Sequence, residues 1–235
     1  MKSFLLAAVG LMVLSAGAKE AVRAVLFPFR EAVIASRVES RLLPYGFRVG
    51  EPFKAQSVLV KLDDERFQLE KKRAEDLYKF NLASFENKQK LREKNFTSDF
   101  ELKKAEYEKN SAENALLEAR LNCSYCLITA PFEGKIVEIL TREYETVRPG
   151  QPICRIIDDN YLLAVMNVPM DEKSLTTVGS PVRIKLDSGM VVSGEIYEVS
   201  PQADHRTGTL RIRVKIDNRQ GKVTAGATGV LIYGE

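Results

Sequence analysis

Histidine and cysteine are scarce in this chain, which has one histidine, His205, and three cysteines among 235 residues. A zinc site would have to be built without the usual imidazole ligands, and His205 stands in a polar turn, where we expect it at the surface. The chain also has no Gly-rich phosphate loop, nucleophile elbow or paired-histidine motif. Its many carboxylates lie mostly on the outer faces of predicted helices. We therefore expect no enzyme active site, no metal site and no cofactor.

An excess of one charge sign is lacking too. The chain has 35 basic and 32 acidic residues, for a formal net charge of +3, and the two kinds are interleaved along the helical segments. Nucleic-acid-binding domains concentrate basic residues on one face, so we expect no nucleic-acid partner. With 45% apolar and 29% charged residues, the composition is that of a globular protein of one or two modest domains.

A continuous apolar run occurs only near the N-terminus. Lys2 is followed by the apolar residues 4–14 and then by the small residues 15–18, the pattern of a secretory signal peptide over residues 1–18 that is cleaved after Ala18. An uncleaved membrane anchor is the alternative, but the run is well short of the roughly 20 residues that span a bilayer. We expect the mature chain to lie on the far side of the inner membrane.

Two stretches, residues 38–64 and 132–158, repeat one short β unit at an offset of 94 positions. Matched pairs include Glu39 with Glu133, Arg41 with Lys135, Leu59 with Ile153, Lys61 with Arg155 and Asp64 with Asp158. Each half alternates apolar and polar residues between turn formers, which predicts short strands joined by tight turns. Neither half could bury a core alone. The two halves are therefore expected to pack together.

A charged insert separates the two halves. Residues 64–94 contain neither glycine nor proline, are rich in strong helix formers and predict a helix of about 45 Å. Residues 95–98 predict a turn, because Asn95 tolerates the left-handed conformation that ends a helix, and Ser98 with Glu101 forms a capping box that starts another. A return helix then runs from residue 99 to about residue 122. The insert, residues 64–126, is predicted to be an antiparallel coiled-coil hairpin.

Both predicted helices carry an apolar stripe for packing against each other. On the return helix, positions that alternate at steps of three and four form a seam: Leu102, Ala105, Lys109, Ala112, Leu116, Ala119 and Cys123. This spacing keeps one stripe facing a partner helix. On the first helix the expected inner residues are Phe67, Ala74, Leu77, Tyr78, Phe85 and Leu91.

After residue 159 the pattern changes to strands. Residues 182–187 and 210–217 alternate strictly between apolar and charged side chains, as half-buried strands do. Further strands are expected at residues 161–168, 191–199 and 229–233. Five or six short antiparallel strands predict a small β-barrel over residues 160–235.

The order of split repeat, helical hairpin and barrel resembles that of periplasmic adaptor subunits, the hemolysin D-type membrane fusion proteins of tripartite efflux systems, above all those of the resistance-nodulation-division type. The segments that carry the resemblance are 130–137, 148–152, 194–196, 204–209, 216–218 and 224–226. It implies a mainly β fold in which a lipoyl-like (biotinyl-like) β-sandwich, residues 38–63 and 127–159, is interrupted by the hairpin and followed by the barrel. Residues 19–37 would form an N-terminal strand segment. The further β domain that many of these adaptors have after the barrel is expected to be absent or reduced to the strand at residues 22–27.

Two positions depart from the family pattern. Ser40 and Gln56 stand where the first half usually has glycine, which predicts altered turns there.

The resemblance also implies a function. Such a chain is a non-enzymatic adaptor of the periplasm, held at the membrane by its partners, that links an inner-membrane efflux transporter to an outer-membrane channel. By family resemblance it self-associates into a hexameric ring that seals a conduit for export. The hairpin tip would bind the partner through Leu91, Arg92, Lys94, Asn95, Phe96, Thr97 and Ser98.

The sequence leaves several roles open for the three cysteines. Cys123 and Cys126 form a C-x-x-C pair, which in an exported protein can be a disulfide or a redox pair. Cys123 falls on the helix seam and Cys126 begins the next strand, which favours a structural role, while a disulfide that involves Cys154 and thiol exchange stay open. The alternative function is therefore a lipoyl-like carrier or a thiol-redox module that uses Cys123 and Cys126. A carrier needs an exposed lysine in the β-turn between its halves, and the hairpin replaces that turn.

Overall fold

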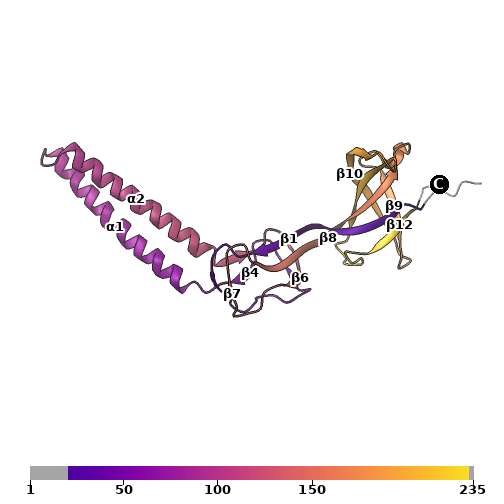
Figure 1. Cartoon of the computed structure of the whole chain (residues 1–235), viewed down its shortest axis with the longest axis horizontal. Helices are drawn as coiled ribbons and strands as arrows, with labels where there is room; N and C mark the ends of the chain where they lie inside the picture. The colour runs from indigo at the N-terminus through magenta and orange to yellow at the C-terminus, as the bar shows by residue number, and fades with distance from the viewer. Residues whose placement is uncertain (1–20, 233–235) are drawn as a thin grey trace, which may run out of the picture. The chain divides into compact units, whose positions relative to one another are not determined.

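The computed structural model describes residues 21–232, apart from the side chain of Lys173. The predicted signal peptide, residues 1–18, lies outside the described residues. The described chain forms two compact units: residues 27–163 with 217–226 make up one, and the remaining described residues make up the other. The chain is mainly β with two long helices, as the sequence predicts (Figure 1). Between residues 21 and 232 no helix has both the length and the apolarity needed to cross a membrane.

The larger unit contains both halves of the repeat. Two long strands, β1 (Arg23–Ala35) and β8 (Pro152–Pro169), belong to this unit only in part: residues 27–35, called here the lower part of β1, and residues 152–163, the first part of β8. Its other strands are β2 (Ser40–Arg41), β3 (Pro52–Phe53), β4 (Val58–Lys61), β5 (Leu127–Thr129), β6 (Gly134–Ile139) and β7 (Thr146–Val147). The β3–β6 pairing, Pro52 opposite Lys135, recurs 94 positions on as the β7–β2 pairing, Thr146 opposite Arg41. This register confirms the repeat and relates its halves by a pseudo-twofold axis.

Both halves contribute to one hydrophobic core. Leu42 and Leu59 from the first half and Ile136 and Ile153 from the second are at most 1% exposed, and all four belong to a single buried cluster. Burial of each such side chain is worth about 1.5–3 kcal/mol. Neither half could complete this core alone, in agreement with the prediction that the halves pack together.

Gln56, one of the two departures from the family pattern, keeps the turn rather than altering it. Its φ of 64° lies in the left-handed region, as does the φ of 82° at its repeat counterpart Gly150. The hydrogen bond from the Gln56 amide to the Ala130 carbonyl (2.9 Å) likewise has a counterpart from Gly150 to Ser36 (2.8 Å). The prediction of an altered turn is therefore wrong at Gln56, because pairing with the other half holds the backbone in a conformation that a non-glycine residue rarely adopts.

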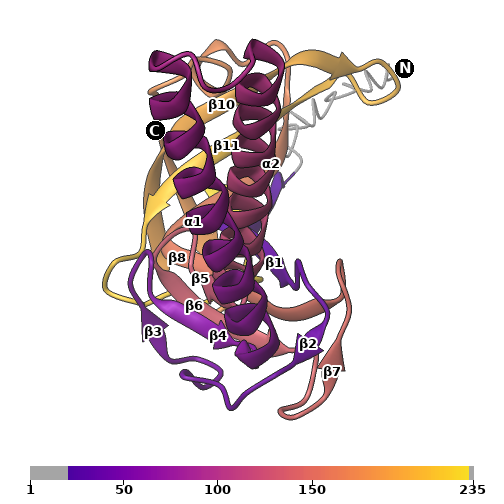
Figure 2. The same ribbon diagram turned by 90° about the vertical axis from the view of Figure 1, so that its left-hand side faces the viewer.

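The insert forms the predicted hairpin of α1 (Glu65–Glu93) and α2 (Asp99–Ser124), which run side by side in Figures 1 and 2. The α2 seam is confirmed: all seven of its residues are buried or half-buried, and Ala105, Ala112 and Leu116 are at most 4% exposed. The small alanines allow the helices to approach closely, so that the seam is filled without long side chains.

The α1 prediction is correct for Phe67, Ala74, Tyr78 and Phe85, which are buried or half-buried, and wrong for two leucines. Leu77 is 51% exposed and Leu91 is 36% exposed. Each precedes by one residue the side chain that takes the inner position, Tyr78 and Arg92, and one residue is about 100° around a helix. Both leucines therefore point away from α2.

The smaller unit is a barrel of antiparallel strands. Its strands are β9 (Pro181–Leu186), β10 (Val191–Asp204), β11 (Thr209–Asp217), β12 (Thr228–Ile232), the start of β1 and the end of β8, and the short 3-10 helix η1 (Lys173–Leu175) precedes β9. The strand order is β1-β12-β9-β10-β11-β8, and β1 also pairs with β8, which closes the ring. Val182, Ile184 and Leu186 are buried, as their alternation predicts.

The strand expected at residues 22–27 is not what remains of a further β domain, because residues 23–26 of β1 belong to the barrel. Arg23, Ala24 and Val25 of β1 pair with Val230, Gly229 and Thr228 of β12. Ala24 and Leu26 are fully buried. The alternation of exposed and buried residues at the start of β1, residues 23–26, follows from this pairing, with one face on the barrel core.

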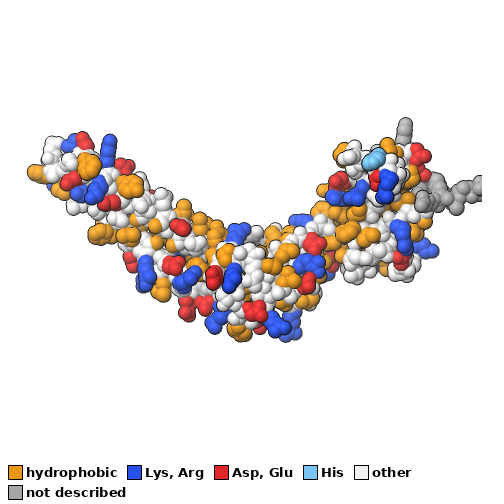
Figure 3. All heavy atoms as spheres, in the orientation of Figure 1, with side chains coloured by type: hydrophobic (Ala, Val, Ile, Leu, Met, Phe, Trp, Pro, Cys, Tyr) orange, Lys and Arg blue, Asp and Glu red, His pale blue; other side chains and the backbone are white. Residues whose placement is uncertain are grey.

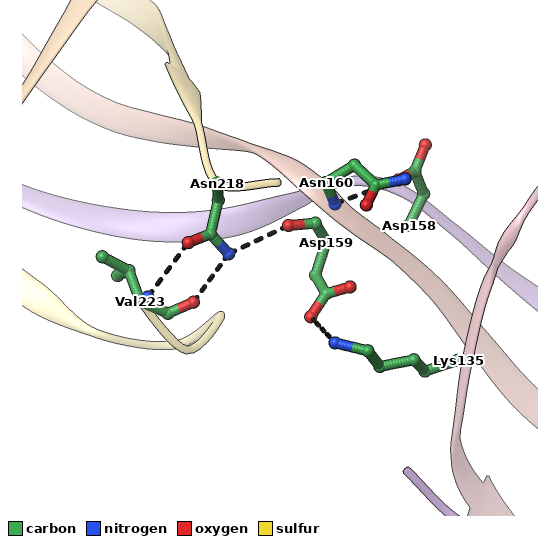
Figure 4. Close-up of polar contacts among 6 residues, drawn as sticks. All are labelled: Lys135, Asp158, Asp159, Asn160, Asn218 and Val223. Atoms are coloured by element: carbon green, nitrogen blue, oxygen red, sulfur yellow. Dashed lines mark hydrogen bonds and ion pairs between the residues drawn. The ribbon is translucent and has the colours of Figure 1, made fainter. Parts of the chain in front are cut away.

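The connection between β11 and β12, residues 217–226, belongs to the larger unit although the sequence pattern assigns it to the barrel. Figure 4 shows the cause: the side chain of Asn218 donates to the carbonyl oxygens of Asp159 (2.9 Å) and Val223 (2.8 Å) and accepts from the Val223 amide (3.0 Å). Lys135 in turn forms an ion pair with the Asp159 carboxylate at 2.7 Å. Asn218 is only 5% exposed, so these bonds are shielded from water.

Candidate functional site

The tip of the hairpin begins with a left-handed residue that ends α1. Asn95 has a φ of 58°, as its position in the predicted turn requires. The Asn95 amide donates to the Arg92 carbonyl (2.9 Å) and the Phe96 amide to the Leu91 carbonyl (2.8 Å). This pair of bonds is a Schellman motif, which satisfies carbonyls that a helix end leaves without partners.

The start of α2 is capped by Ser98. The Ser98 hydroxyl accepts a hydrogen bond from the Glu101 amide at 3.2 Å, as the capping box predicts. Within residues 21–232 the Glu101 carboxylate does not bond back to the Ser98 amide; it accepts from the Thr97 hydroxyl and pairs with Lys88 of α1 at 3.7 Å. The Glu101 side chain therefore helps to join the two helices.

Ion pairs across the turn hold it closed. Arg92 donates from Nε to the Asp99 carboxylate (2.6 Å) and from Nη1 to the Asn95 side-chain oxygen (3.3 Å). The hydrogen bond and charge of Arg92 lower the pKa of Asp99, and the hydrogen bond from Thr97, followed by the charge of Lys88, lowers the pKa of Glu101. Both carboxylates thus stay ionised at neutral pH and keep their partners in place.

These contacts divide the seven predicted tip residues into two groups. Arg92, Asn95, Thr97 and Ser98 use their side chains to build the turn. Leu91, Lys94 and Phe96 leave their side chains exposed, with Phe96 75% exposed.

Sequence reasoning missed a second tip aromatic, Phe100, which is 76% exposed. An aromatic residue just after the capping serine, outside the α2 seam, is the signal that could have found it. The tip therefore presents the cation of Lys94 and the rings of Phe96 and Phe100 on a turn that its own hydrogen bonds and ion pairs hold in place.

The flanks of the hairpin carry apolar side chains that face away from the seam. On α1 they are Leu69, Leu77, Phe80 and Leu91, and on α2 they are Phe100, Tyr107, Leu117 and Leu121, each at least 36% exposed. Phe100, Tyr107 and Leu121 are separated by multiples of seven residues, the spacing of a coiled-coil position. Figure 3 shows hydrophobic side chains interspersed with charged ones along the visible face of the hairpin. Each helix thus has a second apolar stripe besides the one it uses within the hairpin.

The three cysteines carry free thiols and lie in the core beneath the hairpin. Cys123 is at the end of α2, Cys126 follows it by three residues, and Cys154 is on β8. The Cys126 thiol donates to the Asn122 carbonyl at 3.7 Å. Burial raises the pKa of Cys126 and of Cys154 to about 11. Reactive thiols need a lowered pKa, so this environment favours a structural role.

We expect Cys126 and Cys154 in the folded chain to resist alkylation by iodoacetamide at pH 8. A pKa near 11 leaves about 0.1% of a thiol as the reactive thiolate at that pH, and reactivity should rise as the pH approaches 11. Mass spectrometry after alkylation of the folded chain, at pH 8 and at higher pH, measures this resistance. A second sample, alkylated after denaturation with and without reductant, tests for a disulfide. Three alkylated cysteines in the denatured sample without reductant would rule out a disulfide among Cys123, Cys126 and Cys154, whereas a gain of two sites on reduction would establish one.

The barrel matches a known family. Residues 164–232 match the family described as "CusB-like, beta-barrel domain". The predicted kinship with the efflux adaptors is confirmed. Among curated relatives, the chain is 26% identical over 211 residues to the multidrug resistance protein MdtA of Pectobacterium carotovorum, covering 79% of this chain and 51% of that protein. The chain spans between 48% and 59% of the length of the curated relatives it matches.

Solved structures share the fold of this adaptor-like chain. A MacA–MexA chimera that contains the α-hairpin domain of Pseudomonas aeruginosa MexA aligns with a TM-score of 0.77 and 16% identity, covering 91% of this chain and 78% of that one. The membrane fusion protein Spr0693 of Streptococcus pneumoniae R6 aligns with a TM-score of 0.73 and 14% identity, covering 92% and 98%. At such identity the likeness shows the fold alone, and it covers sandwich, hairpin and barrel together.

Proposed function

We propose that this chain is a periplasmic adaptor that links an inner-membrane efflux transporter to an outer-membrane channel. The observation that carries the proposal is the tip, where Lys94, Phe96 and Phe100 are presented to solvent on a turn that is closed by its own caps and ion pairs. A rigid frame with exposed aromatic rings and a cation suits docking against another protein, because little ordering entropy is lost on binding. The multidrug resistance relative supports export as the process served.

We further propose that hairpins of several copies pack side by side, in a ring that is hexameric by family resemblance. The outward stripes on α1 and α2 support this. A helix pair in isolation needs one apolar stripe on each helix, and a second stripe at coiled-coil spacing suits packing against a neighbouring helix. The lipoyl-like sandwich and the barrel would then form the part of the ring that faces the transporter.

The proposal is tested by site-specific crosslinking in cells that make the transporter and the channel. A photo-reactive phenylalanine analogue in place of Phe96 should crosslink to the outer-membrane channel, and one in place of Tyr107 should crosslink to a second copy of this chain. The same analogue in place of Tyr197, an exposed residue of β10, should not reach the channel. Crosslinks at residue 96 to proteins other than a channel, together with a dispersed monomer from residue 107, would overturn the proposal.

The thiol-redox alternative receives no support from the thiols themselves. Cys126 is fully buried, Cys123 is 9% exposed, and burial raises the pKa of Cys126. A redox C-x-x-C opens a helix, where the dipole favours the thiolate, whereas Cys123 lies in the last turn of α2. The carrier alternative would need its lysine at the point where β4 and β5 are joined, and that connection is the hairpin itself.

A further inference from the structure

Two edge strands of the sandwich lie beside one cavity at the base of the hairpin. Residues 33–35 of β1 and β5, residues 127–129, are repeat counterparts at the offset of 94. In the described part of the larger unit, β5 pairs only with β4, and the lower part of β1 pairs only with β8. Both strands therefore present an open edge.

The hydrogen-bond register shows which backbone groups are open on β5. The carbonyl of Cys126 accepts from Leu62, and Ala130 bonds with Ser57 and Gln56, so the even-numbered residues face β4. Backbone groups alternate in direction along a strand. Those of Leu127 and Thr129 therefore point away from β4, where they can pair with an added strand.

The cavity beside these edges has a volume of about 370 Å³. Its lining includes residues 33–35 of β1, residues 127–129 of β5, and the side chains of Arg37, Tyr125 and Pro131. Val33 and Leu127, themselves repeat counterparts, are 56% and 51% exposed. Surface-exposed branched side chains next to an open edge give a floor for the apolar side chains of an incoming peptide.

Arg37 is the one charged residue that lines the cavity. Its guanidinium lies 5.2 Å from the centroid of the Tyr125 ring, a cation–π arrangement that fixes its position. No carboxylate within residues 21–232 forms an ion pair or hydrogen bond with it in the structure. A positioned guanidinium without an acidic partner is complementary to a carboxylate.

We propose that this cavity binds an extended peptide segment of a partner protein, in which apolar residues lie next to an acidic group. The segment adds as a strand to the open edge of β5. Its apolar side chains lie against Val33 and Leu127, and its carboxylate binds Arg37. The site goes beyond docking at the hairpin tip, because it lies at the opposite end of the hairpin, and it requires neither a channel nor a ring.

The test uses the purified secreted chain and a fluorescein-labelled peptide of sequence Val-Thr-Val-Thr-Asp with a free C-terminus. Fluorescence anisotropy should show saturable binding. Arg37→Glu should weaken binding at least about tenfold, as expected when a charge-assisted hydrogen bond is lost and replaced by repulsion. Thr129→Pro should weaken it as well, because it removes an outward N–H without touching the ladder to β4. Arg48→Glu, a change of equal charge at an exposed residue outside the cavity, should leave binding unchanged.

Circular dichroism spectra and thermal midpoints equal to those of the parent chain would show that the variants fold. A second peptide, with asparagine for aspartate and an amidated end, should bind at least about tenfold more weakly if the carboxylate is recognised. Absence of saturable binding by the parent chain, or equal binding by Arg37→Glu and Arg48→Glu, would overturn the proposal. Self-association that Arg37→Glu abolishes without any peptide would also overturn it and would assign the cavity to a second copy.

Discussion

The Gly134→Ala variant is expected to lose about 3 kcal/mol or more of its unfolding free energy. A Cβ at this position would lie 2.0 Å from the carbonyl oxygen and 2.9 Å from the carbonyl carbon of Ile157. Both atoms belong to the backbone of β8, the partner of β6, so no side-chain rotation can relieve the contact. Overpacking usually costs about 1–3 kcal/mol, and a backbone collision lies at the upper end. Urea unfolding of the purified chain is the measurement.

The other half of the repeat explains why glycine is needed here. Ser40 is the counterpart of Gly134, and Asp63 is the counterpart of Ile157. The Ser40 hydroxyl donates to the Asp63 carbonyl at 2.6 Å, so in that half the strands stand far enough apart to hold a side chain. Gly134 lies on β6, where the backbone of β8 comes too close to leave room for a side chain.

Gly46→Ala is the matched control for this experiment. An added Cβ at Gly46 would meet only the Val58 carbonyl oxygen, at 3.6 Å, an ordinary contact. We expect a change within about 1 kcal/mol for this variant. Equal stability of Gly134→Ala and Gly46→Ala would mean that β6 and β8 approach each other less closely than the structure shows.

Charge reversal at Lys94 is expected to abolish export without unfolding the β units. The Lys94 side chain is exposed at the tip and has no part in the caps that close the turn, so Lys94→Glu changes what a docking partner meets and leaves the frame intact. Like charges placed in an interface cost several kcal/mol. The measurement is resistance or efflux in a strain that lacks the native chain and expresses the variant with its transporter and channel.

Ser98→Pro tests the frame of the tip rather than its surface. The φ of −81° at Ser98 suits proline, but the substitution removes the hydroxyl that accepts from the Glu101 amide. Loss of such a cap costs about 0.5–2 kcal/mol at the helix start, so the turn should loosen, export should fall to background and the sandwich should stay folded.

Lys72→Glu provides the control for charge, because Lys72 is exposed on α1 at the end of the hairpin remote from the tip. It should export normally. Normal export by both Lys94→Glu and Ser98→Pro would show that the tip is not a docking site, whatever the role of the rest of the chain.

Much of this fold could be predicted because local signals agreed with one another. The α2 seam, the turn at Asn95 and the Ser98 cap each have a strict spacing, and the offset of 94 between the halves proved to be the symmetry of the strand pairing. On α1 the signal was weaker, since its apolar residues are spread around the helix. Leu77 and Leu91 were therefore assigned to the wrong face, and only packing against α2 selects Tyr78 and Arg92.

Other features depend on contacts between residues far apart in the chain, which periodicity does not encode. Asn218 binds the backbone of Asp159 across 59 positions, and this contact places residues 217–226 with the larger unit. The cavity beside Arg37 is likewise lined by residues of both β1 and β5. Each is visible only in the folded chain.

The pairing of β4 with β5 has a consequence for how such a chain can change. Lys61 and Leu127, which enter and leave the insert, stand directly opposite each other in that ladder. Whatever the length of the helices, the chain must return to the same place, and the entropy of closing a longer loop rises only slowly. The hairpin could therefore gain or lose whole heptads while the β4–β5 ladder at its base stays unchanged. The length of the hairpin can thus vary without a change in the sandwich.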